Sequence, residues 1–127
     1  MKNLLTVTAL IEGVTGLLLV AAPSFVTKLL LDSSLDGSVG LTIARLTGLA
    51  LLTLTVACWL ARLDRETRAA DAMVTAMVLY NVGAVALLAY AGIALRLSGI
   101  GLWPAVLLHA VMSAWCVLSL RKRPAQQ

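Results

Sequence analysis

The chain has 127 residues, of which 61% are hydrophobic and 13% are charged, and its mean hydropathy is +0.97. This composition excludes an ordinary water-soluble domain of this length and indicates an integral membrane protein. The formal net charge is +4, and the charged residues fall mainly between long apolar runs. We therefore expect one transmembrane domain that covers residues 1–127.

Four apolar runs are long enough to cross a bilayer, because a spanning helix needs about 20 mostly apolar residues. They cover residues 4–22, 41–61, 72–95 and 102–120. Their continuous apolarity differs from the alternating pattern of barrel strands, and open backbone is not tolerated in lipid. The sequence therefore predicts an all-α fold, an integral membrane four-helix bundle.

The first run also has features of a cleavable signal peptide, namely Lys2 at its start and small residues before Pro23. Glu12 inside the apolar stretch, and a proline directly after the candidate cleavage site, argue against cleavage. We expect a retained helix that ends at Pro23, where Ser24 can cap a short interfacial helix over residues 24–31.

The basic residues are distributed unevenly between the two sides of a four-span chain. Two lie on one side, Lys28 and Arg96, and seven on the other: Lys2, Arg62, Arg65, Arg68, Arg121, Lys122 and Arg123. The positive-inside rule then places both termini in the cytoplasm, and the protein in the inner (cytoplasmic) membrane as a multi-pass protein. We expect no nucleic-acid partner, and the three basic residues of the tail are fewer than a polybasic lipid site usually carries.

Each apolar run contains one prominent polar or ionisable residue: Glu12, Arg45, Asn81 and His109. Counted from the outer end of each run, Arg45 lies about 6 Å deep, His109 about 10 Å, Glu12 about 15 Å and Asn81 about 20 Å. Such residues are costly in lipid and usually mark functional sites that face the bundle interior. We predict that these four residues line a ligand-binding pocket open towards the outer half of the membrane.

Two other interpretations of these residues stay open. Glu12 and His109 could hold or pass a proton, because burial disfavours a charged carboxylate and imidazole titrates near physiological pH. Alternatively, Glu12 and Arg45 form a structural ion pair, and Asn81 and His109 join helices through hydrogen bonds.

Small and sulfur-containing residues are expected to serve packing. Gly13 and Gly16 in the first run, and Ala44 and Gly48 in the second, allow close approach of helices. Cys58 and Cys116 lie near the cytoplasmic ends of their runs and form no Cys-x-x-Cys motif, which argues against a disulfide oxidoreductase.

The sequence offers little support for an enzyme. A single histidine cannot supply bis-histidine haem ligation, and the spacing of Asp, Glu, His and Cys does not match a metal site. No nucleophile motif or phosphate-binding glycine loop is present in the sequence. We therefore expect no cofactor and no metal.

The stretch from Thr8 to Gly16, with its membrane-embedded glutamate, resembles the first helix of the small multidrug-resistance transporters, which are also four-span chains. This resemblance implies a proton-coupled exporter of small molecules centred on Glu12. Three features differ from that family. The third run lacks its aromatic-rich segment, the charge asymmetry argues against dual insertion, and Arg45 would compete for the carboxylate.

Over its whole length the chain more closely resembles small four-helix bacterial inner-membrane proteins that are loosely DoxX-like. The shared features are Ile11 to Gly16 ahead of Pro23, Ala44 to Gly48 at the start of the second run, and Trp103-Pro104 with His109 in the fourth. The resemblance implies a four-helix bundle and little about activity.

From the buried polar residues we expect a protein that binds a membrane lipid or a small amphipathic ligand. Arg45 would contact an anionic head group, and Glu12 or His109 a hydrogen-bonding group. Alternatively, the chain is expected to be an accessory subunit of a larger membrane complex or to form a homo-oligomer.

Overall fold

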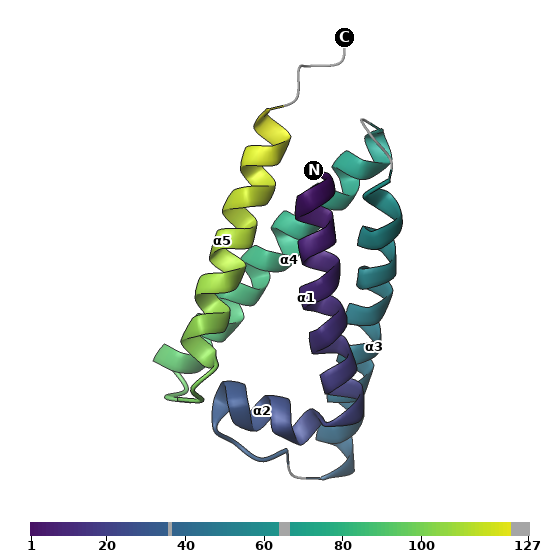
Figure 1. Cartoon of the computed structure of the whole chain (residues 1–127). Helices are drawn as coiled ribbons and strands as arrows, with labels where there is room; N and C mark the ends of the chain where they lie inside the picture. Colours follow the sequence, from purple (N-terminus) through teal and green to yellow (C-terminus); the bar gives the residue numbers. More distant parts are fainter. Residues whose placement is uncertain (36, 64–66, 123–127) are drawn as a thin grey trace.

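The computed structural model describes residues 1–35, 37–63 and 67–122, and in these ranges the regular secondary structure is entirely helical (Figure 1). The five helices are α1 (Lys2–Ala21), α2 (Pro23–Leu31), α3 (Ser38–Ala61), α4 (Arg68–Ile93) and α5 (Leu102–Arg121). The all-α prediction is confirmed. Arg65 and Arg123, which contribute to the predicted charge asymmetry, lie outside the described residues.

Helices α1, α3, α4 and α5 are long and apolar enough to cross a membrane by length and composition. Many of their large apolar side chains are exposed, among them Leu79, Leu87 and Val39. Exposed apolar surface on this scale is unusual for a soluble monomer and is expected of helices that face hydrocarbon. The four helices thus suggest a membrane protein.

The helices differ from the predicted apolar runs mainly at their ends. α3 and α4 begin at Ser38 and Arg68, three and four residues before the runs, so each helix extends beyond its predicted apolar part. The Thr67 hydroxyl caps α4 by accepting a hydrogen bond from the Ala70 amide at 3.2 Å. α4 ends at Ile93, shortly before Arg96 takes a positive φ of 58°.

The four long helices form two antiparallel pairs, α1 with α3 and α4 with α5 (Figure 1). The start of α1 and the end of α5 lie at the same end of the molecule, which we call the terminal end. α2 lies across the opposite end, which we call the α2 end. α2 covers the segment 24–31 for which a short helix is predicted, and begins one residue earlier, at Pro23.

Close backbone contact between two glycines holds α1 against α3. A Cβ on Gly16 would lie 2.8 Å from the Gly48 carbonyl oxygen, and a Cβ on Gly48 would lie 2.7 Å from that of Gly16. Because these neighbours are backbone atoms, no side-chain movement could make room for a methyl group. The expected role of these glycines in packing is confirmed at this pair.

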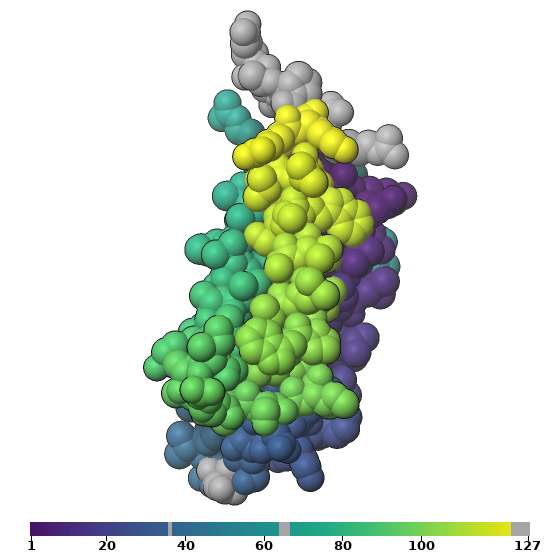
Figure 2. Space-filling model, turned by 90° about the vertical axis from the view of Figure 1, so that its left-hand side faces the viewer, coloured from purple at the N-terminus to yellow at the C-terminus, as the bar shows by residue number. Residues whose placement is uncertain are grey.

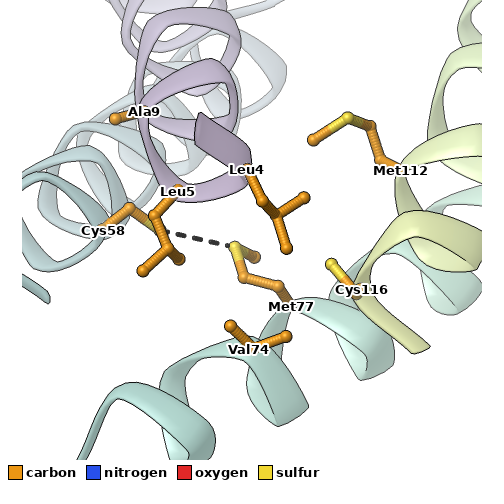
Figure 3. Packing of buried hydrophobic residues seen from close by; sticks show 8 residues of the cluster. All are labelled: Leu4, Leu5, Ala9, Cys58, Val74, Met77, Met112 and Cys116. Atoms are coloured by element: carbon orange, nitrogen blue, oxygen red, sulfur yellow. Dashed lines mark hydrogen bonds between the residues drawn. The ribbon is translucent and has the colours of Figure 1, made fainter. Parts of the chain in front are cut away.

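The main buried apolar cluster joins the two helix pairs near the terminal end (Figure 3). It contains residues of all four long helices: Leu4, Leu5, Ala9, Cys58, Val74, Met77, Met112 and Cys116. The Cys58 thiol donates to Met77 Sδ at 3.5 Å, and both cysteines are free and buried. They serve packing, as expected.

α2 connects the two helix pairs at the opposite end. Its Val26 is buried with Leu19 and Leu51, on the side of α1 and α3. On the other side, the Gly101 amide donates to the Leu29 carbonyl oxygen at 2.8 Å, and Gly99 leaves no room for a Cβ beside the Leu30 backbone. The turn between α4 and α5 is thereby fastened to α2.

The glycine contact makes a testable prediction for stability. Gly48→Ala should destabilise the fold by about 1–3 kcal/mol, because the added methyl group forces α1 away from α3. The midpoint of thermal unfolding in detergent micelles, followed by circular dichroism, measures the effect. Gly83→Ala is the matched control, since a Cβ at Gly83 meets nothing within 4 Å. Equal losses in the two variants would contradict the assigned contact.

Candidate functional site

Glu12 lies at the middle of α1, and only 4% of its surface is exposed. The Tyr80 hydroxyl of α4 donates a hydrogen bond to Glu12 Oε2 at 3.0 Å. This bond crosses from one helix pair to the other at a place where the α1 and α4 backbones have little direct contact. The carboxylate therefore faces other helices rather than the outer surface.

Asn81, the next residue of α4, extends the polar contacts to α5. Its Nδ2 donates to the Met77 carbonyl oxygen at 2.7 Å, and its Oδ1 lies 2.9 Å from His109 Nδ1. Because the amide oxygen can only accept, His109 Nδ1 carries the hydrogen in this arrangement. The Nε2 atom of a neutral His109 ring is then an acceptor.

The Tyr80 and His109 rings meet edge to face, with centroids 5.7 Å apart and planes at 79°. This geometry is favourable for two aromatic rings. Glu12, Tyr80, Asn81 and His109 thus form one connected group across α1, α4 and α5, which we call the polar cluster.

Thr8 lies one helical turn from Glu12 and on the same face of α1. Only 2% of its surface is exposed, and its Oγ1 has no hydrogen-bond partner among the described residues. Within the same ranges, the Tyr80 hydroxyl supplies the single hydrogen bond to the Glu12 carboxylate. A carboxylate can accept several hydrogen bonds. The Glu12 carboxylate and the Thr8 hydroxyl can therefore both form further hydrogen bonds.

Arg45 does not join the other predicted site residues. Its side chain is exposed on α3, and the parts of the chain that the structure describes contain no ion pair between Arg45 and Glu12. The ion pair of the structural interpretation is therefore wrong for this structure, and Arg45 lies outside the polar cluster. The second part of that interpretation, a hydrogen bond between Asn81 and His109 that joins two helices, is confirmed.

The glycine contact between α1 and α3 explains this separation. Gly16 faces Gly48, and the helices are antiparallel. Glu12 lies four residues from this contact towards the terminal end, whereas Arg45 lies three residues from it towards the α2 end. At 1.5 Å per residue, the two positions are about 10 Å apart along the helix axes.

Tyr80 is the site residue that the sequence prediction missed. Tyrosine in membrane helices usually lies near the interfaces, where its hydroxyl meets water. Tyr80 instead lies well inside the apolar run 72–95, directly before Asn81. A tyrosine at that depth needs a hydrogen-bond partner within the protein, and this could have indicated its contact with Glu12.

The described residues contain no group of three or more His, Cys, Asp and Glu side chains that could hold a metal ion. Comparisons of the chain with protein-family models, with curated proteins and with solved structures find no match. The two family resemblances seen in the sequence therefore stay predictions.

Removing only the Tyr80 hydroxyl tests the link between the helix pairs. Tyr80→Phe should lower stability by about 1 kcal/mol, because Glu12 then loses a buried hydrogen bond. Unfolding in detergent micelles measures the change. Tyr90→Phe is the control on the same helix, since Tyr90 is 58% exposed. If the two variants unfold alike, the Tyr80 hydroxyl does not join the helix pairs.

Proposed function

We propose that this chain is a multi-pass protein of the inner membrane, with both termini in the cytoplasm, that binds a lipid or small amphipathic ligand at the polar cluster. The four apolar helices and their exposed apolar side chains support the membrane location. The basic residues at the terminal end support the orientation, among them Lys2, Arg68 and Arg121.

One observation carries the proposed ligand site: among the described residues, buried Glu12 has no cation beside it, and the nearby Thr8 hydroxyl has no hydrogen-bond partner. A buried carboxylate is costly unless a cation or enough hydrogen bonds compensate it. Tyr80 supplies one such bond. A ligand with a cationic or hydrogen-bond-donating head group would supply the rest, while its apolar part lies among the helices.

This proposal differs from the sequence prediction in the expected head group. Arg45 was the residue predicted to contact an anionic group, and it lies outside the polar cluster. The groups that remain are the Glu12 carboxylate, the Tyr80 hydroxyl and the His109 ring. Of these, the carboxylate is the strongest acceptor, so amines are the favoured ligand class.

Binding of a single-chain amine tests the site. Wild-type protein in nanodiscs should bind dodecylamine more tightly than dodecanol, as measured by native mass spectrometry. Glu12→Gln should weaken amine binding about 10-fold to 100-fold, since hydrogen bonds to charged groups contribute about 1.5–3 kcal/mol. Asp32→Asn, at an exposed carboxylate beyond the end of α2, serves as control. Equal binding by both variants would exclude Glu12 as the head-group contact.

A proton-coupled exporter centred on Glu12 is the second candidate. The described residues place no cation beside the Glu12 carboxylate, and this favours an exporter, because such a group can exchange a proton for a cationic substrate. The nearby His109 ring, in contact with Tyr80, offers a second titratable group.

Transport in proteoliposomes distinguishes the two candidates. An exporter should drive accumulation of a fluorescent amine when a pH gradient is imposed, and Glu12→Gln should abolish it. Transport that survives in Glu12→Gln would exclude this carboxylate as the coupling group. Amine binding without any gradient-driven transport by the wild type would leave the binding protein as the better proposal.

A further inference from the structure

A second region with ligand-binding character lies on the outer surface of the α4 and α5 pair. Two adjoining hollows of about 450 and 530 Å³ share Val82, Val117 and Arg121. We call them together the α4–α5 groove. Figure 2 views the molecule from the side of α5, with α4 beside it. None of the four residues of the polar cluster lines this groove.

The groove is apolar along most of its length. α4 contributes side chains such as Val78 and Val85, and α5 contributes the small residues Ala110 and Ala114, which leave the space between the helices open. Among the described residues that line it, Arg121 in the last turn of α5 is the charged one. An apolar groove with a cation at one end matches the chemistry of an anionic amphiphile.

The length of the groove matches an acyl chain of a lipid in one leaflet. From Ala110 to Arg121 the helix rises eleven residues, or about 16 Å, which is about half of the roughly 30 Å hydrocarbon core. Since α5 is proposed to end at the cytoplasmic side, Arg121 lies at the depth of the phosphate groups of that leaflet. The apolar part of the groove then lies at the depth of the acyl chains.

The cationic end of the groove is accessible. Arg121 and the following Lys122 are both exposed, and across residues 1–35, 37–63 and 67–122 neither side chain has an ion pair or a side-chain hydrogen bond. A guanidinium group can bind a phosphate through two parallel hydrogen bonds, and an adjacent ammonium group adds a second charge. Arg121 is thus placed to select an anionic head group above the groove.

We propose that the α4–α5 groove holds the acyl chains of one anionic phospholipid of the cytoplasmic leaflet, with its phosphate on Arg121 and Lys122. The proposal rests on the membrane placement given above and is independent of the ligand proposed for Glu12. Its occupant contacts a different helix surface and carries the opposite charge.

Competition between two lipids tests the proposed head-group contact. Protein reconstituted in vesicles of equal parts phosphatidylglycerol and phosphatidylcholine, then extracted in mild detergent, should retain several-fold more phosphatidylglycerol by native mass spectrometry. Arg121→Gln should remove this preference. Arg96→Gln is the matched control, because Arg96 is exposed at the α2 end. An equal preference in the two variants would overturn the assignment to Arg121.

Filling the groove tests the acyl-chain contact. Ala114→Phe should lose the retained lipid of either class, whereas Val111→Phe should keep it, since Val111 is 55% exposed on α5 and lines neither hollow. Equal lipid retention by the two variants would overturn the proposal. The proposal would also be overturned if the wild type were a dimer without lipid and Ala114→Phe made it a monomer. That result would assign the groove to a second copy of this chain.

Membrane fractionation distinguishes a failure of the membrane placement from a failure of the lipid-binding groove. Each variant is first shown to stay in the membrane pellet after alkaline washing, which tests the proposed location by itself. A wild-type protein that leaves the pellet would defeat the membrane placement and the groove together. A protein that stays in the pellet but retains no phosphatidylglycerol would defeat the groove alone.

Discussion

Polar side chains inside apolar helices must find their hydrogen-bond partners within the protein, and this constraint organises the centre of the molecule. Glu12 of α1 accepts from Tyr80, and Asn81 meets His109 of α5. Because Tyr80 and Asn81 are neighbours on α4, the Glu12–Tyr80 bond between the helix pairs and the Asn81–His109 bond within the α4 and α5 pair lie at one level. Van der Waals packing alone would not specify which faces of the pairs meet, since lipid tails solvate apolar faces equally well.

The two kinds of helix contact differ in character. Within the α1 and α3 pair, the Gly16 and Gly48 backbones touch, which leaves little freedom for sliding. Between the pairs, contact depends on longer side chains, including Met77 and Met112, which adapt readily to changes in spacing (Figure 3). α2 spans both pairs at the other end. The proposed ligand site therefore lies at the more adaptable of the two interfaces.

The molecule has two candidate binding regions whose charged groups have opposite sign. The polar cluster lies at mid-length, with Glu12 and Asn81 buried and Tyr80 and His109 partly buried, and offers a carboxylate, a hydroxyl and an imidazole. The α4–α5 groove is open at the surface and offers apolar walls below a guanidinium group. A cationic or hydrogen-bond-donating molecule suits the first, and an anionic lipid suits the second. Such a lipid would be a resident of the membrane rather than a substrate.

The sequence by itself determined the helical class, the four apolar helices and the short helix near residues 24–31, because length and apolarity suffice for these. It also indicated that Glu12, Asn81 and His109 meet partners inside the protein, since polar residues at that depth are otherwise costly. The exclusion of Arg45 and the inclusion of Tyr80 were decided only by the tertiary structure. Helical periodicity gives the face of a residue along one helix, whereas the register between helices depends on contacts such as Gly16 with Gly48. That register moves Arg45 away from Glu12, and the packing of α4 against α1 brings the Tyr80 hydroxyl to it.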